Sequence, residues 1–392
     1  MARIKLKRFR HPFRTAQALK IRLQAHLGMR RFAGESAKRY TGDPRYHPQN
    51  VTDGFASRMD DSSDDTALLE RICSAYNRAH EDEQAASPLN RPTEWWHQLR
   101  DGPLQPVIRA LRAHDLTTLR RMYGNFFRDP CSTGLVPVPW GMARKYFRGP
   151  IQGAYCHACL GDALQRIDYW TAQTRGRFEL RQLAGPGVGN PFGVFIDGIL
   201  LAPAAEYHHF CAQSLLSKLG AGRRVVAEIG GGYGGMAYYL LRDGGTLTYL
   251  NFDVPESLAL MSWYLMKAFP SLRFLLYGER EIGEQFATGA DVLLMPPSAM
   301  TNVSERSVDV TFSSHAMSDL SRDDLTAYLN LVERITRNYF FYIGNGRAGR
   351  TLAALIAERQ GRLTPAETRP SDWNRHKSPA VEVESLYCLD RA

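Results

Sequence analysis

The sequence predicts an α/β fold in which a mainly parallel sheet occupies the C-terminal half of the chain. From Arg224 onward, short apolar strands alternate with amphipathic helices, the order that produces a parallel sheet. Before residue 200, apolar residues recur at helical spacing between several prolines. At 392 residues the chain exceeds one typical domain. We expect a basic tail over 1–40, a polar linker over 41–65, a mainly helical cover domain over 66–200 and a sheet domain over 201–392.

Turn and capping signals place the elements of the sheet domain. Asp197-Gly198 predicts a tight hairpin, and a helix over 204–219 is expected to end at Gly220. Pro255 suits the first position of a helix, and Ser321 begins a capping box. The expected strands are 225–229, 246–252, 273–277, 291–295, 308–312, 339–343 and 381–389.

The positive charge of the chain is concentrated at its start. The formal net charge is +9, yet residues 1–40 alone hold 12 Lys and Arg against one acid, Glu35. The other 352 residues carry 37 basic and 39 acidic residues, a net of −2. Leu19, Leu23 and Leu27 recur every fourth residue among these cations, which predicts an amphipathic basic helix. Such a helix either docks on anionic lipid or nucleic acid, or packs on its own domain.

Composition narrows the class of protein. The longest apolar runs are strand-length, well short of the roughly 18–20 residues that cross a bilayer, and no signal-peptide pattern is present. We therefore expect a cytoplasmic protein whose six scattered cysteines are free thiols. Cys156 and Cys159 have metal-like spacing, but no second pair of this kind exists to complete a zinc site.

The strongest chemical signal is the glycine turn Glu228-Ile-Gly-Gly-Gly-Tyr-Gly-Gly235, placed between a strand and a helix. Such a turn exposes backbone N–H groups and lets a ligand approach the main chain closely. Its glycines also fit the dinucleotide fingerprint. The carboxylate of Glu228, however, suits a ligand that carries ammonium and sulfonium charges and repels a pyrophosphate. Asp253, 18 residues after Gly235, ends the next strand, where a carboxylate can accept from ribose hydroxyls.

These segments resemble the motifs of a known family. Glu228–Gly235, Asp253–Glu256 and Val308–Leu320 look like motifs of class I S-adenosylmethionine-dependent methyltransferases. More narrowly, the chain is similar, over roughly residues 105–345, to bacterial sugar O-methyltransferases. The segments that carry this narrower likeness are Tyr249–Asp253, Tyr264–Pro270, Leu276–Glu279, Val188–Gly193, Tyr207–Phe210 and Asn125–Arg128.

The resemblance implies a Rossmann-like sheet, S-adenosylmethionine as cofactor and a sugar or glycosylated small molecule as acceptor. It implies that Glu228, Gly230, Gly232 and Gly234 hold the methionine end of the cofactor and that Asp253 holds the ribose. The rest of the expected cofactor set is Gly231, Tyr233 and Ser313.

Methyl transfer from a sulfonium to a hydroxyl needs alignment and removal of one proton. His315 is the first candidate for general base, because it directly follows an expected strand at the ligand-binding edge of the sheet. Asp319 is expected to orient it or to act itself, and His208 is a second choice. The expected acceptor-binding residues are Asn190, Tyr207 and His209. A divalent metal is an alternative activator, although no carboxylate cluster marks a site for it.

Three other functions are compatible with parts of the pattern. A nucleic-acid methyltransferase would use the basic tail, and Met295-Pro-Pro-Ser298 is a near match to a tetrapeptide of amino-methyltransferases. The net charge of −2 outside the tail argues against a broad phosphate-binding groove. An NAD-dependent oxidoreductase is opposed by Glu228. A binding module without activity would not need Glu228, the glycines and Asp253 together.

Overall fold

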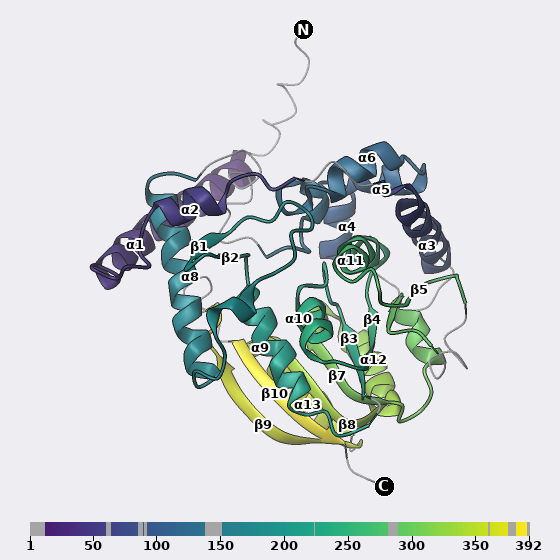
Figure 1. Cartoon of the computed structure of the whole chain (residues 1–392). Coiled ribbons are helices and arrows are strands. Elements are labelled where there is room, and N and C mark those ends of the chain that lie inside the picture. Colours follow the sequence, from purple (N-terminus) through teal and green to yellow (C-terminus); the bar gives the residue numbers. More distant parts are fainter. Residues whose placement is uncertain are drawn as a thin grey trace.

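The computed structural model describes residues 12–59, 64–84, 89, 92–137, 151–222, 224–280, 289–359, 361–374 and 382–389. Its centre is an eight-stranded sheet with the order β5-β6-β4-β3-β7-β8-β10-β9 (Figure 1). The strands, in that order, are Phe274–Leu276, Val292–Met295, Leu247–Phe252, Arg224–Ile229, Val308–Ser314, Thr336–Asn345, Glu382–Leu389 and Leu363–Ser371. The first six strands in this order, from β5 to β8, run parallel. Strand β10 pairs antiparallel with both β8 and β9. The expected Rossmann-like α/β class is confirmed.

Strand β9 is the element of the sheet that sequence reasoning missed. It contains Pro365 and Pro370, which remove two backbone donors and give no strand signal. Both prolines are tolerated because β9 lies at the edge of the sheet, where its other side needs no partner.

Helices cover both faces of the parallel strands. On one face, α9 (Ala205–Leu216), α10 (Gly235–Asp243) and α11 (Pro255–Ala268) share a core with Val226 and Val310. On the other, α12 (Arg322–Ile335) and α13 (Gly346–Arg359) pack with Ala227 and Val308. Because both faces are buried, these strands read as continuous apolar runs in the sequence.

The N-terminal region is helical and continues the first of these cores. Among the helices over 66–123, α3 packs beside α11, whereas α5 and α6 lie above it (Figure 1). Helix α8 (Ala154–Gln173) packs on α9. The hairpin expected at Asp197-Gly198 is present as β1 (Val194–Ile196) and β2 (Ile199–Leu201). The remaining helices and 3-10 turns are α3 (Thr66–Gln84), α4 (Glu94–Arg100), α5 (Gln105–Arg112), α6 (Leu116–Tyr123), η3 (Phe126–Arg128), η4 (Pro130–Ser132), α8 (Ala154–Gln173), η5 (Leu180–Leu183), η7 (Pro297–Asn302) and η8 (Ala316–Asp319).

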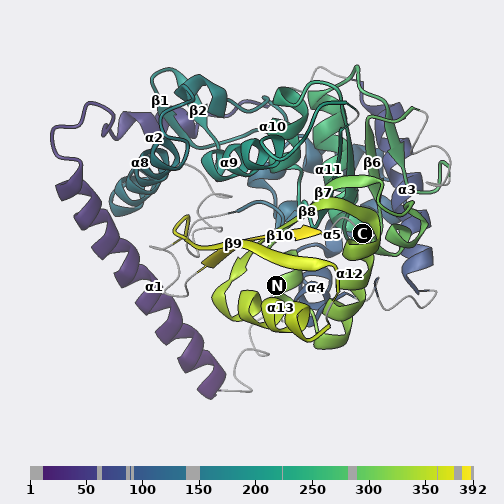
Figure 2. The same cartoon turned by 90° about the horizontal axis from the view of Figure 1, so that it is seen from below.

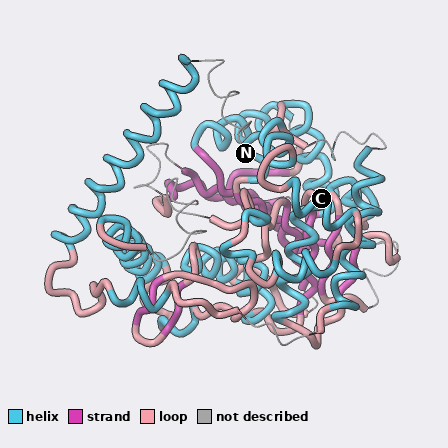
Figure 3. Tube along the Cα trace, turned by 90° about the horizontal axis from the view of Figure 1, so that it is seen from above, coloured by secondary structure: helices cyan, strands magenta, loops and turns pink. Residues whose placement is uncertain are grey.

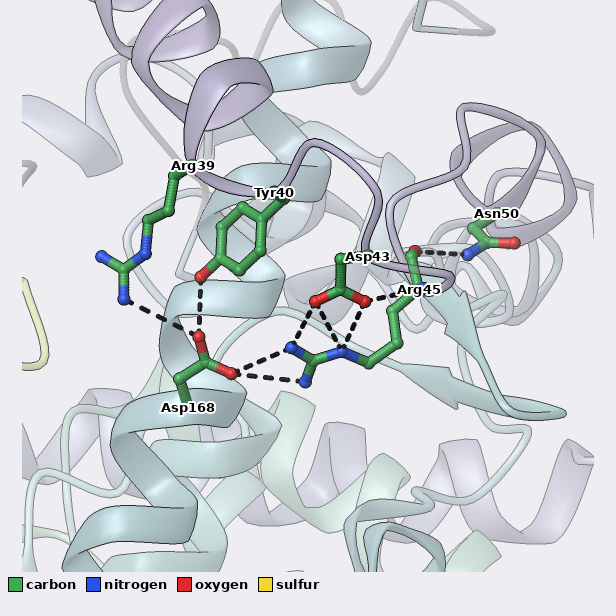
Figure 4. A network of polar contacts seen from close by, with 6 residues as sticks. All are labelled: Arg39, Tyr40, Asp43, Arg45, Asn50 and Asp168. Carbon is green, nitrogen blue, oxygen red and sulfur yellow. Dashed lines mark hydrogen bonds and ion pairs between the residues drawn. The ribbon is translucent and has the colours of Figure 1, made fainter.

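The segment assigned to a polar linker is folded in the part that the structure describes. Residues 41–59 include α2 (Gln49–Gly54), and Val51 and Phe55 are buried. Asp168 of α8 accepts hydrogen bonds from Tyr40 (2.9 Å) and Arg45 (3.2 Å) (Figure 4). Composition suggested a linker because the polar residues of this segment gave no periodicity, but two of its side chains, Arg45 and Tyr46, form hydrogen bonds to α8.

Helix α1 (Pro12–Arg39) falls in the predicted basic tail and packs on α8 through its second half. Met29, Phe32, Ala33 and Ser36 are buried there. The first half of the helix runs away from the body of the protein (Figures 2 and 3).

Candidate functional site

The glycine turn after β3 has a backbone that requires glycine at several positions. Gly230, Gly232 and Gly234 have φ angles of +79°, +60° and +93°, in the left-handed region that other residues rarely adopt. A Cβ on Gly230 would also lie 2.0 Å from the Cβ of Ala316, at the start of η8. The turn therefore brings bare backbone against the end of β7 and leads directly into α10.

Asp253 fastens this turn to the next strand. Its Oδ2 accepts from the Gly232 N–H (3.0 Å) and from the Ser257 hydroxyl, and its Oδ1 accepts from the Val254 N–H (2.8 Å). Burial raises the pKa of this carboxyl to about 6, against the lowering effect of those bonds. Asp253 thus organises the turn and the start of α11, and it also lies on the wall of a cavity.

The cavity has a volume of about 270 Å³ and lies at the carboxyl ends of β3, β4, β6 and β7. The chain passes from β3 to β4 on one side, while β7 pairs with β3 on the other, so this edge is the topological switch point where open α/β sheets bind ligands. The wall carries the carboxyl groups of Glu83, Asp253 and Asp319, and among the described residues that line it there is no Lys or Arg.

Helices of the N-terminal region close the cavity. Glu83 of α3 forms an ion pair with Arg100 of α4 (2.8 Å), and Arg100 also binds Glu256 of α11 (2.8 Å). Trp95, half exposed, and Trp96 line the cavity from α4. Sequence reasoning did not find these cavity residues, because they lie more than 130 positions before the glycine turn and match no motif.

Glu228 lies beneath the glycine turn and is not one of the residues that line the cavity. A Cβ on Gly231 would be 2.9 Å from Glu228 Oε2 and 2.4 Å from Asn251 Nδ2. The carboxyl accepts a hydrogen bond from Tyr249, yet burial raises its pKa to about 8. The fixed negative charge expected from the sequence is therefore a protonated carboxyl at neutral pH in the free protein.

His315 and Asp319 reach the same cavity as Asp253. His315 directly follows β7, has a φ of +64°, and is held by its backbone N–H to Ile343 O (2.8 Å). Its side chain is 40% exposed, and Nε2 lies 3.9 Å from Glu382 Oε1. Asp319 ends η8 and is exposed.

Other predicted residues serve the surrounding structure. Ser313 donates to Ile229 O (3.0 Å), which ties β7 to β3. Tyr233 is buried among aromatic rings of the N-terminal region rather than on the 270 Å³ cavity. Tyr207 does not line the cavity, but its hydroxyl is hydrogen-bonded to that of Ser314, which does (2.6 Å between the two oxygens).

His208, His209 and Asn190 lie away from the cavity. His208 faces a second space of about 250 Å³ beside Tyr233, and burial lowers its pKa to about 3. His209 is fully buried, accepts from the Trp170 indole N–H (3.1 Å), and has its pKa lowered to about 4 by burial. Asn190 accepts from the Arg58 backbone N–H (2.7 Å). These contacts hold the fold.

Within the described part of the chain, no group of three His, Cys, Asp or Glu side chains is arranged to hold a metal ion. All six cysteines are free thiols. None of the described helices is both long and apolar enough to span a bilayer. A further hollow of about 420 Å³ lies among α8, α9 and β8–β10, but it is lined by none of the glycines of the turn.

The fold and the site define a Rossmann-like α/β protein with a cavity at the switch point of its sheet. No protein-family model and no curated protein matches the sequence. Among solved structures it is similar to an S-adenosylmethionine-dependent methyltransferase from Aquifex aeolicus (12% identity, 46% of this chain and 89% of that one, TM-score 0.32).

Two further solved structures are similar at the same level. One is magnesium protoporphyrin IX methyltransferase from Synechocystis with bound S-adenosylmethionine (11% identity, 58% of this chain and 97% of that one, TM-score 0.34). The other is geranyl diphosphate C-methyltransferase from Streptomyces coelicolor (12% identity, 50% and 79%, TM-score 0.33). At TM-scores of this size the matches decide nothing about function, which has to be inferred from the site.

Proposed function

We propose that the chain binds S-adenosylmethionine in the 270 Å³ cavity and transfers its methyl group to a hydroxyl of a sugar or glycosylated small molecule. The observation that carries the proposal is the charge of the cavity wall. Asp253 and Asp319 line it together with Glu83, whose charge is balanced by Arg100, and its described lining contains no Lys or Arg. A low-dielectric, acidic site favours a ligand with sulfonium and ammonium charges and disfavours a pyrophosphate.

The residues present fit this cofactor. The glycine turn allows close approach to the main chain, and Asp253 is a buried acceptor on the cavity wall for ribose hydroxyls. Glu228, beneath the turn, would ionise in response to a nearby positive charge. When bound, the cofactor supplies a methyl group activated by its positively charged sulfur.

The acceptor side has features that suit a saccharide. Trp95 and Trp96 offer flat apolar surfaces at the cavity, on which the C–H faces of a sugar ring can pack. The carboxylate of Asp319 can accept from sugar hydroxyls. A nucleic acid would meet carboxylates there and no described cation, which disfavours its phosphates.

His315 is our candidate for the base that removes the hydroxyl proton. Its imidazole lines the cavity, and its Nε2 lies 3.9 Å from Glu382 Oε1.

Calorimetry of the full chain with S-adenosylmethionine, S-adenosylhomocysteine and NAD tests the cofactor. We expect micromolar dissociation constants, about −8 kcal/mol, for the first two and no heat with NAD. Binding of NAD alone would overturn the proposal. Transfer of a labelled methyl group to a panel of sugars, glycosides, RNA and DNA then tests the acceptor, and transfer to nucleic acid alone would reject the saccharide.

A further inference from the structure

Helix α1 carries two apolar stripes on opposite faces. Phe32 and Ser36 are buried against α8, where a Cβ on Gly161 would lie 2.2 Å from Ser36 Oγ. Leu23 precedes Phe32, and Leu27 precedes Ser36, by nine residues, which is two and a half helical turns. The two leucines therefore point away from α8, and they are 59% and 56% exposed.

The exposed stripe is held clear of the rest of the protein. Beyond its contact with α8, α1 runs outward from the body (Figures 2 and 3). Its direction is fixed at the other end by Tyr40 and Arg45, which both bind Asp168 of α8 (Figure 4). Leu23 and Leu27 are two of only four large hydrophobic side chains that are exposed in the described part of the chain. A rigidly directed helix that presents leucines to solvent is suited to contact a partner.

The sequence around this stripe is strongly basic. Residues 1–40 hold 12 Lys and Arg and a single acid, Glu35, which is paired with Arg31 (2.8 Å). Arg30 and Arg31 are exposed and follow Leu27 by three and four residues, which places them on the same side of the helix. An anionic bilayer can bind both the leucines and the cations, because leucines enter the acyl boundary and cations meet the headgroups. A nucleic acid would pair with the cations and leave the leucines in water.

We propose that α1 docks the protein on anionic lipid surfaces, with Leu23 and Leu27 inserted and Arg30 at the headgroups. The second half of the helix and the Asp168 contacts then hold the sheet domain at a fixed orientation to the membrane. The inference does not depend on which ligand the 270 Å³ cavity binds.

Flotation of the full chain with vesicles tests this docking. We expect binding to phosphatidylcholine vesicles that contain about 30% phosphatidylserine at about 0.15 M salt, weaker binding at high salt, and little binding to phosphatidylcholine alone. The double variant Leu23→Ser, Leu27→Ser should reduce the partition coefficient more than about tenfold. Both side chains are exposed, so circular dichroism should show an unchanged fold.

Met59→Ser is the matched control, because Met59 is also an exposed large hydrophobic but lies outside α1; it should bind vesicles as the wild type does. No binding to anionic vesicles, equal binding to neutral ones, or full binding by the leucine double variant would each overturn the proposal. Salt-sensitive binding to duplex DNA that the leucine variant retains, without vesicle binding, would assign the helix to nucleic acid instead.

Discussion

The protonation of Glu228 should couple cofactor binding to pH. Burial raises the pKa of this carboxyl to about 8, although the hydrogen bond from Tyr249 acts to lower it. In the ligand-free protein Glu228 is therefore mostly neutral at pH 7. A cationic ligand bound at the glycine turn favours the ionised form, so binding should release a proton.

The size of this effect follows from the charges. A unit positive charge about 4 Å from a carboxylate contributes about 4 kcal/mol at an effective dielectric constant of 20, which is about three pKa units. A ligand cation at such a distance would lower the pKa of Glu228 in the complex well below its value of about 8 in the ligand-free protein. Between the lowered pKa of the complex and pH 8, each pH unit should increase the affinity for S-adenosylmethionine about tenfold, and above pH 8 the contribution should level off.

The variant Glu228→Gln keeps the shape of the side chain and an acceptor for Tyr249 but cannot ionise. Calorimetry from pH 6 to 9, in buffers of different ionisation enthalpy, gives both affinity and protons released. We expect the variant to bind about a hundredfold more weakly than wild type at pH 7 and about a thousandfold at pH 9. Titration of the ligand's own amine affects both proteins equally, so the ratio of their affinities isolates Glu228.

Tyr249→Phe gives an independent check. It removes the hydrogen bond that lowers the pKa of Glu228. The cofactor affinity of this variant should therefore level off at a higher pH than that of the wild type. A ratio between wild type and Glu228→Gln that stays constant from pH 6 to 8 would refute the coupling.

Two further substitutions probe the cavity, and a third probes the ion pair between Arg100 and Glu256. His315→Asn is chosen because asparagine tolerates the φ of +64°. It should lower kcat about a hundredfold or more and leave the dissociation constant of the cofactor within about twofold. An unchanged kcat would exclude His315 as the base. Trp95→Ala should raise the KM for a saccharide about tenfold while cofactor binding, measured by calorimetry, stays the same; an unchanged KM would remove Trp95 from the acceptor site. Arg100→Met leaves Glu256, whose side chain is 2% exposed, without its cation, and should lower the free energy of unfolding in urea by about 3–5 kcal/mol. A loss below about 1 kcal/mol would show that Glu256 is protonated or otherwise satisfied.

Local features of the sequence determined the sheet and the turn. Alternating apolar strands and helices, glycines at positions of positive φ and the hairpin at Asp197-Gly198 all act within a few residues, so they can be read without tertiary contacts. The rule that ligands bind at the carboxyl ends of parallel strands also placed Asp253, His315 and Asp319 at one edge, and all three line the same cavity.

Tertiary packing decided which of the other side chains reach that cavity. In the sequence, His209 and Asn190 look like polar surface residues. In the fold both are buried, and they accept hydrogen bonds from Trp170 and Arg58. Glu83 and Trp95 line the 270 Å³ cavity because α3 and α4 fold back over the carboxyl edge of the sheet. No local sequence pattern predicts that α3 and α4 pack over this edge.

The sequence by itself determined where the main chain bends, which stretches pair as strands, and that a carboxyl group, Glu228, precedes the glycine turn. Only the tertiary structure decided whether that group is charged, because the pKa depends on how much water the folded chain removes from around it. The same distinction holds for α1. The spacing of its leucines and cations is evident from the sequence, but the position of α8 determines which face of α1 is buried and which is exposed.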